Sequence, residues 1–236
     1  MADGRSSEQW VPLECNEEIL NAYIAKMGVR EGQVAFNEIF GFDALEYVPR
    51  PVKAVLLCFP ICDASEKYAA DEAERISSVG QVCAPGVFYM KQTVGNACGT
   101  IGVLHAMGNL RASEGLSIET GSYLDGFFKS VEAMSPVEIG AYLEGDRALE
   151  QVHEEAAQGG QSDVPEDLDN VMLHFICFSL VDGNLYELDG RKETPINHGP
   201  SSAETLLDDS IRVIREFMAR DPDNLNFTMV ALSQAC

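Results

Sequence analysis

Residues 173–189 read LHFICFSLVDGNLYELD, two apolar segments joined by Asp182-Gly183. An Asp-Gly dipeptide between apolar segments is a strong signal for a two-residue type I′ turn, because both central residues of that turn take positive φ angles. The stretch therefore predicts an antiparallel β-hairpin. Since residues 173–181 are apolar on both faces of the expected strand, we expect a central strand that is covered on both sides.

The expected hairpin brings two polar side chains to one face of the sheet. With Asp182 and Gly183 as the turn, pairing along the hairpin puts Asp189 opposite Ile176, and His174 lies diagonal to Asp189. Diagonal neighbours are roughly 7–8 Å apart, a gap that these two side chains can bridge. A three-residue turn would instead put Asp189 on the other face. The pair suits either a carboxylate that orients a catalytic imidazole or a structural histidine bonded to a surface carboxylate.

Caps, stops and apolar segments predict the other elements of the fold. We expect helices from Asn16 to Gly28, over 97–110, from the capping box of Ser135, Pro136 and Glu138 to 149, and from a second box of Ser201 and Glu204 to Asp221-Pro222, with further strands at 54–59, 87–91 and 227–232. The expected fold is α/β (α+β), with a central, largely antiparallel sheet flanked by helices on both sides. Because no repeat or linker divides the chain, we expect one domain over residues 1–236.

The segment from Gln92 to Thr100, QTVGNACGT, places a cysteine in the first turn of an apolar helix. Free backbone amides and the positive end of the helix dipole stabilise a thiolate at Cys98. The side-chain amide of Gln92, together with the backbone amide of Cys98, would suit an oxyanion hole. Cysteines also occur at helix starts for structural reasons alone, so this feature by itself leaves both interpretations open.

A thiolate nucleophile needs a base, and the chain holds four histidines. His105 is on the same helix as Cys98 but two turns away, which is too far for a hydrogen bond. His153 and His198 lie in polar segments, and we expect both to be solvated. His174 is then the base that remains.

The excess of acidic over basic residues limits which chemical classes of binding partner suit the protein. The chain has 16 Lys and Arg against 38 Asp and Glu, a formal net charge of -22. A nucleic-acid or anionic membrane partner is excluded, because such a surface repels phosphates. A basic protein or peptide is favoured, with solubility alone as the alternative.

Residues 154–169 form the most acidic stretch, with no basic residue, a Gly159-Gly160 pair and Pro165. This composition predicts a long, mobile, acidic loop over about 154–169. Loops of this length inside a domain tend to be lids or binding loops, although a plain linker is also compatible.

The cysteines and apolar segments indicate the cellular compartment of the protein. Seven cysteines make an odd count, and a chain of this size needs no disulfides, so we expect reduced thiols in the cytoplasm, with the nucleus also open. We expect no secretory signal, because residues 1–9 have no cationic region leading into an apolar stretch, and the longest apolar run, 54–62, is too short to cross a bilayer. No cysteine pair has zinc-ligand spacing. We expect no metal, no cofactor and a monomer.

The motifs together resemble one family of cysteine peptidases, the ubiquitin C-terminal hydrolases, and most closely its short single-domain subgroup. The resemblance covers nearly the whole chain and rests on Trp10–Glu14, Val48–Pro51, Gln92–Thr100, Leu173–Phe175, Leu185–Arg191 and Asp221-Pro222.

The resemblance implies a papain-like arrangement with Cys98 as nucleophile, His174 as base and then acid, Asp189 as the group that orients it, and Gln92 as oxyanion donor. The implied reaction is hydrolysis after the C-terminal glycine of ubiquitin through a thioester. The resemblance also implies that the acidic loop crosses over the active site, so that only small or unstructured leaving groups can pass beneath it.

The resemblance further implies ubiquitin as partner, and Nedd8 is open as a second. The implied ubiquitin contacts are Pro12, Leu13, Glu14, Cys15, Asn16, Glu17, Ala157, Gln158, Gly159, Gly160, Gln161, Ser162, Asp163, Val164 and Asn224. One alternative function is a ubiquitin-binding or sequestering protein with weak or misaligned catalysis. Another is an acyl- or amidotransferase that uses the same cysteine, histidine and aspartate.

Overall fold

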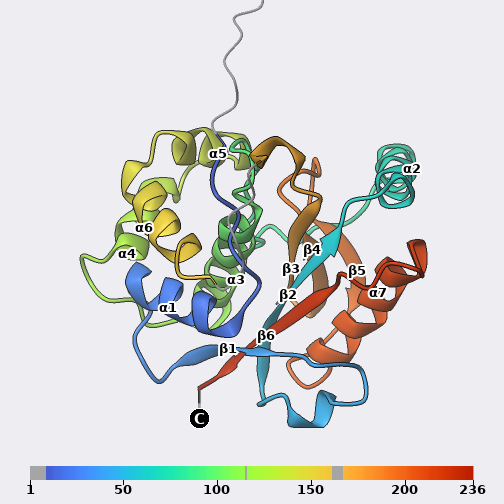
Figure 1. Ribbon diagram of the computed structural model, residues 1–236, viewed down its shortest axis with the longest axis horizontal. Helices are drawn as coiled ribbons and strands as arrows, with labels where there is room; N and C mark the ends of the chain where they lie inside the picture. Colours follow the sequence, from blue (N-terminus) through green and yellow to red (C-terminus); the bar gives the residue numbers. More distant parts are fainter. Residues whose placement is uncertain (1–8, 115, 161–166, 236) are drawn as a thin grey trace, which may run out of the picture.

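A six-stranded antiparallel sheet runs through the part of the chain that the structure describes, with strand order β1-β6-β2-β3-β4-β5 (Figure 1). The structure is a computed structural model, and it describes residues 9–114, 116–160 and 167–235. The strands are β1 (Val34–Glu38), β2 (Val52–Pro60), β3 (Leu173–Val181), β4 (Asn184–Leu188), β5 (Ile196–Pro200) and β6 (Thr228–Gln234). Every neighbouring pair is antiparallel, as the sequence predicts.

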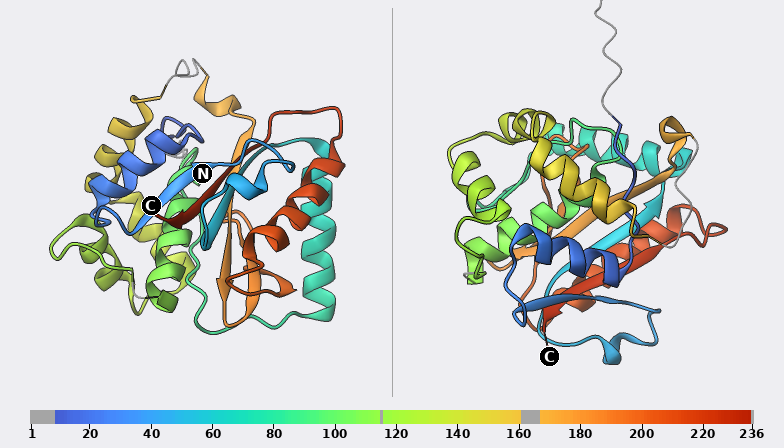
Figure 2. Two further views of the ribbon diagram at one scale, coloured as in Figure 1. Left: turned by 90° about the horizontal axis from the view of Figure 1, so that it is seen from below. Right: turned by 60° about the vertical axis from the view of Figure 1, so that its left-hand side comes forward.

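Helices cover both faces of this sheet. They are α1 (Glu17–Met27), α2 (Asp63–Val79), α3 (Cys98–Glu114), α4 (Tyr123–Val131), α5 (Pro136–Glu144), α6 (Arg147–Ala157) and α7 (Leu206–Arg220), with short 3-10 helices at Leu45–Tyr47 and Leu168–Asn170. Figure 2 shows α1 and α3 to α6 on one side of the sheet, and α2 and α7 on the other. The expected sheet between two helical layers is therefore confirmed.

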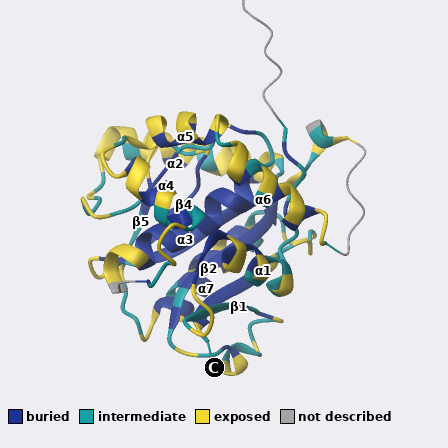
Figure 3. Ribbon diagram, turned by 90° about the vertical axis from the view of Figure 1, so that its left-hand side faces the viewer, coloured by how far each residue is buried: buried dark blue, intermediate teal, exposed yellow. Residues whose placement is uncertain are grey.

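The apolar strands explain why both layers form. On β2, Leu56 packs into the cluster that contains α3, while its neighbours Val55 and Leu57 pack into the cluster that contains α7. Successive side chains of a strand point to opposite faces, so a strand that is apolar throughout needs cover on both. Burial of the α3 residues 97–110 on all sides, visible in Figure 3, makes that helix the centre of one layer.

The hairpin has the expected register. Val181 pairs with Asn184, and Cys177 pairs with Leu188. The turn residues Asp182 and Gly183 have φ angles of 47° and 75°, as a type I′ turn requires. The Asp-Gly signal therefore determines where the side chains of β3 and of the residues after β4 point.

Helix caps are confirmed at two of the expected places. The Asn16 side chain accepts hydrogen bonds from the first turn of α1, and Gly28 ends that helix with a φ of 103°. The capping box of Ser135 and Glu138 opens α5. The expected helix up to 149 is in fact two helices, because α5 ends at Gly145 and Asp146 caps α6.

Two other local expectations are wrong. The box of Ser201 and Glu204 does not form, because α7 begins after Thr205, whose side chain bonds to Ser202 instead. Residues 87–91 are not a strand. The reason is that backbone groups of Phe88 and Met90 bond to side chains of α3, with Phe88 N–H donating to Asn109 Oδ1 at 2.8 Å, while the Lys91 N–H donates to the Pro136 carbonyl.

The expected acidic loop begins later than the sequence indicates. Glu154 to Ala157 are the last turn of α6, because Leu149, His153, Ala156 and Ala157 form a buried face on that helix.

None of the helices in the described ranges is long and apolar enough to span a membrane.

Candidate active site

The first turn of α3 holds Cys98 at the boundary between the sheet and the helical layer. The chain enters the helix through Asn96, which has a left-handed φ of 59°. Gly95 is held by a bridge to Gln9, and its carbonyl accepts the Trp10 N–H at 3.0 Å. Cys98 is 7% exposed and packs with Phe175 of β3. A buried thiol at a helix N-terminus therefore faces the start of the central hairpin strand.

His174 and Asp189 meet as the hairpin register predicts. The distance from His174 Nε2 to Asp189 Oδ1 is 2.7 Å, and both side chains are buried. The second contact of this carboxylate comes from the Arg191 backbone N–H, which donates to Oδ1 at 2.9 Å. The carboxylate is thus fixed by its own turn before it binds the imidazole.

The electrostatics of this pair favour a charged imidazole. Burial by itself lowers the pKa of His174, but the charge and hydrogen bond of Asp189 and a hydrogen bond with Cys98 raise it to about 10. Burial raises the pKa of Asp189, but the attraction of His174 lowers it to about 2. The raised pKa of His174 favours the imidazolium form at neutral pH, and an imidazolium beside a cysteine sulfur favours a thiolate.

Gln92 is bound to the same turn. Its backbone N–H donates to the Gly190 carbonyl at 2.9 Å. A Cβ on Gly190 would lie 2.9 Å from the Gln92 Cβ, so only glycine permits this approach. The side-chain nitrogen of Gln92 donates to the Val94 carbonyl at 3.1 Å, and because an amide nitrogen carries two hydrogens, one N–H is left for a second acceptor.

A buried network supports the turn that carries Asp189. The Tyr89 hydroxyl donates to the carbonyl of Asp189 at 2.6 Å and also contacts the carbonyl of Lys192. The Lys192 ammonium lies between Glu72 of α2, at 2.6 Å, and Glu187 of β4. These charges are paired and largely buried, so they tie α2, β4 and the turn into one unit. This network could not be predicted from local patterns, and its one signal in the sequence is the charged Glu187 inside an apolar strand.

The other three histidines are bound elsewhere. His105 accepts the Met90 N–H at 3.1 Å, which agrees with its exclusion as the base. The expectation that His153 and His198 are solvated is wrong. His153 is fully buried between the Thr100 hydroxyl, at 2.8 Å, and the Val11 carbonyl, and burial lowers its pKa to about 4. His198 bonds to the buried Glu187 carboxylate at 2.8 Å.

Two of the three segments expected to contact ubiquitin lie together. The segment Pro12–Glu17 passes over the start of α3, where Leu13 Cβ lies 3.0 Å from the Cβ position of Gly99. Gly160, at the end of the described part of the 157–164 segment, packs against Glu14, and the neighbouring Gly159 packs against Ile19. Asn224 belongs to the third segment, which joins the end of α7 to the start of β6. Gln161, Ser162, Asp163 and Val164 lie outside the described residues.

Both described ends of the acidic segment lie near the cysteine. Gly160 packs against Glu14 at one end. At the other end, the Leu168 carbonyl accepts a hydrogen bond from Asn96 Nδ2 at 2.9 Å. Asn96 is two residues before Cys98 in the chain. The two described ends of the segment, at Gly160 and Leu168, therefore lie close to the N-terminus of α3.

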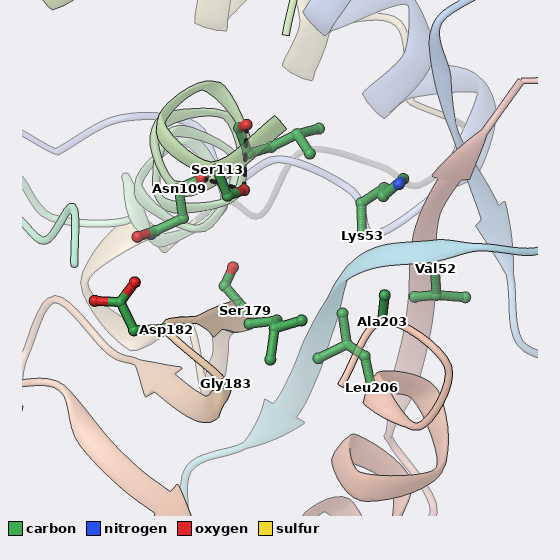
Figure 4. A pocket seen from close by; sticks show the side chains of 11 residues that line it. Val52, Lys53, Asn109, Ser113, Ser179, Asp182, Gly183, Ala203 and Leu206 are labelled. Carbon is green, nitrogen blue, oxygen red and sulfur yellow. Dashed lines mark hydrogen bonds between the residues drawn. The ribbon is translucent and has the colours of Figure 1, made fainter. Parts of the chain in front are cut away.

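Two cavities lie outside this cysteine-histidine contact. A space of about 580 Å³ between α2, α7 and the 189–194 turn reaches Asp189 from the side of the sheet opposite α3. A smaller cavity of about 130 Å³ lies near the hairpin turn, at the far end of β3 from His174 (Figure 4).

Comparison with known protein families and sequences gives a consistent result. A family model described as ubiquitin carboxyl-terminal hydrolase, family 1, matches residues 10–219. The chain is 43% identical over 235 residues to ubiquitin carboxyl-terminal hydrolase 3 of Arabidopsis thaliana, covering 99% of this chain and 97% of the relative. It is 42% identical over 229 residues to the human ubiquitin carboxyl-terminal hydrolase isozyme L1, covering 96% and 99%.

Solved structures show the same fold. The catalytic domain of Trichinella spiralis UCH37, solved with ubiquitin vinyl methyl ester, has a TM-score of 0.73 to this chain at 18% identity. The match covers 100% of this chain and 98% of that one. The expected papain-like fold class is therefore confirmed.

Proposed function

Because the chain belongs to family 1 of the ubiquitin carboxyl-terminal hydrolases, and is thus a cysteine peptidase, we propose that it cleaves small adducts and short or unfolded extensions from the C-terminal glycine of ubiquitin. The observation that carries this proposal is the alignment of Cys98, His174 and Asp189, with a 2.7 Å bond between the last two. A hydrolase with a cysteine nucleophile uses a base beside the sulfur and a group that orients the base, and the His174–Asp189 bond supports these roles.

The proposed reaction begins at the Cys98 sulfur. The thiolate attacks the carbonyl carbon of the C-terminal glycine, and the oxyanion that forms accepts hydrogen bonds from the Cys98 backbone N–H and the second side-chain N–H of Gln92. His174 gives its proton to the leaving amine or alcohol, and a thioester remains on Cys98. His174 then takes a proton from water, which attacks the thioester and releases the ubiquitin carboxylate and the thiolate.

The site suits a basic peptide that ends in a slender tail. The net charge of -22 attracts a cationic partner, and the C-terminal tail of ubiquitin carries arginines that would have to enter between acidic surfaces. Glu14 lies on the segment that covers the start of α3, beside Gly160. We propose that these segments, together with residues 161–164 and Asn224, contact ubiquitin, and that Nedd8 is a second substrate to be tested.

A ubiquitin electrophile tests the proposed function. Ubiquitin with a vinyl methyl ester at its C-terminus should form one covalent adduct with the protein, located on Cys98 by peptide mass spectrometry. The same warhead on Nedd8, used at equal concentration, measures selectivity as a ratio of labelling rates. Absence of an adduct with ubiquitin would show that the proposed function is wrong.

The acidic segment should limit the size of the leaving group. Its two described ends lie near Glu14 and Asn96, and we propose that the residues between these ends restrict the leaving group. Lengthening this segment between Gly160 and Leu168 with a flexible insert should raise cleavage of a folded ubiquitin conjugate relative to a short extension. The rates of both substrates are compared by gel and fluorescence assays.

A matched control separates gating from general loosening. The same insert after Gly80, in the exposed turn that ends α2, should leave the ratio of the two rates unchanged. An unchanged ratio in the first variant as well would contradict the gating role of the acidic segment.

A further inference from the structure

Three thiols from separate parts of the chain meet at the candidate active site. Cys98 and Cys58 form one buried cluster with Phe175, and Cys15 packs against it. All three are free thiols. They come from the start of α3, from β2 and from the segment before α1. Only Cys98 has a chemical part in the proposed hydrolysis, so the thiol groups of Cys15 and Cys58 have no assigned chemistry.

Cys15 and Cys58 differ in their freedom to reach Cys98. Cys58 is in a central strand, paired with Phe175 on one side and Thr228 on the other. Cys15 lies outside any helix or strand, is partly exposed, and immediately precedes the N-cap residue of α1. Its segment is already held over the helix start, because Leu13 contacts the position of Gly99. A small shift of this segment therefore moves the Cys15 sulfur without breaking the sheet.

We propose that Cys15 and Cys98 together form an oxidation site for a hydroperoxide, in which Cys15 closes a reversible disulfide on the oxidised Cys98. The inference rests on the proposed role of Cys98 as a thiolate nucleophile. Cys15 is thus a resolving thiol, the residue that converts a sulfenic acid to a disulfide.

The chemistry balances with one peroxide and two thiols. The Cys98 thiolate attacks one oxygen of hydrogen peroxide, the O–O bond breaks, and the departing hydroxide takes the His174 proton to become water. Cys98 is now a sulfenic acid. The Cys15 sulfur attacks the Cys98 sulfur, the S–O bond breaks, and the departing hydroxide takes the Cys15 proton as a second water. The two thiols give up two electrons, and a dithiol reductant restores them.

The electrostatics set the order of the two steps. Burial, the charge of Glu38 and the charge of Cys98 all raise the pKa of Cys15. Cys15 therefore keeps its proton, and because peroxide reacts with thiolates, the first step falls on Cys98, the proposed nucleophile. Once Cys98 is an uncharged sulfenic acid, one of the groups that keep the proton on Cys15 is gone. Burial, the largest of the influences on Cys15, still favours its thiol form, so its proton leaves together with the attack on the Cys98 sulfur.

The disulfide would inactivate the enzyme reversibly and protect Cys98 from irreversible oxidation. It removes the nucleophile and draws the Pro12–Glu17 segment onto the helix start. It also prevents further oxidation of Cys98 to sulfinic acid, which ordinary thiol reductants cannot reverse.

The test treats the full chain with hydrogen peroxide, blocks the remaining thiols with N-ethylmaleimide and digests it without reduction. Mass spectrometry should find a peptide pair joined through Cys15 and Cys98, which disappears after dithiothreitol. Hydrolysis by wild type, measured with a ubiquitin C-terminal fluorogenic amide, should fall in peroxide and recover in dithiothreitol. After the same treatment Cys15→Ala should recover roughly tenfold less activity, each protein being compared with its own untreated rate.

Two controls define the outcome. Cys83→Ala, outside the cluster, should recover like wild type. A Cys58–Cys98 peptide, no joined peptide at all, or full recovery in Cys15→Ala would each overturn the proposal. Because the disulfide is detected without substrate, its absence is distinguishable from a failure of the proposed hydrolysis, which would appear in the untreated enzyme.

Discussion

Cys98→Ala should reduce kcat/KM for a ubiquitin C-terminal fluorogenic amide by about 10⁴-fold or more. The methyl group of alanine has no electron pair to attack the glycine carbonyl, and no other thiol of the cluster can replace it. Cys58 is held in β2, and Cys15 keeps its proton because burial and nearby charges raise its pKa. The variant should still bind ubiquitin, since the expected contact segments do not include Cys98. Calorimetric titration with ubiquitin measures that binding directly.

The control for this variant is a second cysteine substitution. Cys83 is partly buried at the β5 side of the sheet, where its thiol contacts the Pro195 carbonyl. Cys83→Ala removes the same atoms away from α3 and should keep near wild-type hydrolysis. Full activity in Cys98→Ala would show that another group is the nucleophile. Loss of both hydrolysis and ubiquitin binding would indicate that the variant disturbs the fold, which circular dichroism then checks.

The sequence predicts best what short-range chemistry decides. The Asp-Gly turn sets the register of β3 and β4, and the register alone puts His174 and Asp189 on one face, where the structure finds them bonded. The same is true of Asn16 and Gly28, which bound α1 through caps that need only a few residues. These features depend on backbone geometry within short stretches of chain, at most 15 residues for His174 and Asp189, so they can be derived without knowing the rest of the fold.

Features that need distant segments could not be derived in this way. The strand expected at 87–91 has the right composition, but its backbone groups bond to Asn109 and His105 of α3, which no local pattern shows. Similarly, the position of Cys15 beside Cys98 depends on how the segment before α1 packs over α3. Tertiary contacts override local preference in each case.

Polarity also misleads when the partner is far away in sequence. His153 is next to an acidic stretch and looks solvated, yet it is buried because Thr100 and Val11 supply both of its hydrogen bonds. A polar side chain is buried at little cost when its partners are already in place. Composition alone therefore assigns such residues to the surface.

Asp189→Asn should lower kcat by about 10²- to 10⁴-fold and also move the pH profile. The direction follows from the groups around His174. Burial lowers the pKa of His174, and Asp189 is the main group that raises it, to about 10. Without the carboxylate charge, the imidazolium loses its proton at a lower pH. The alkaline limb of kcat/KM should then fall from near pH 10 in wild type towards the ordinary histidine range of about 6.5.

The control is the same aspartate-to-asparagine change at the turn of the hairpin, at Asp182. Asp182→Asn also exchanges a carboxylate for an amide, and asparagine tolerates the positive φ of 47° at that turn position. It should leave both kcat and the alkaline limb in place, because β3 separates it from His174. An Asp189→Asn enzyme with a lower kcat but an unshifted limb would mean that the carboxylate orients the imidazole without setting its charge. A different result would contradict the requirement for an imidazolium. In it, Asp189→Asn shifts the alkaline limb but keeps wild-type activity at neutral pH, so catalysis would not need the protonated form of His174.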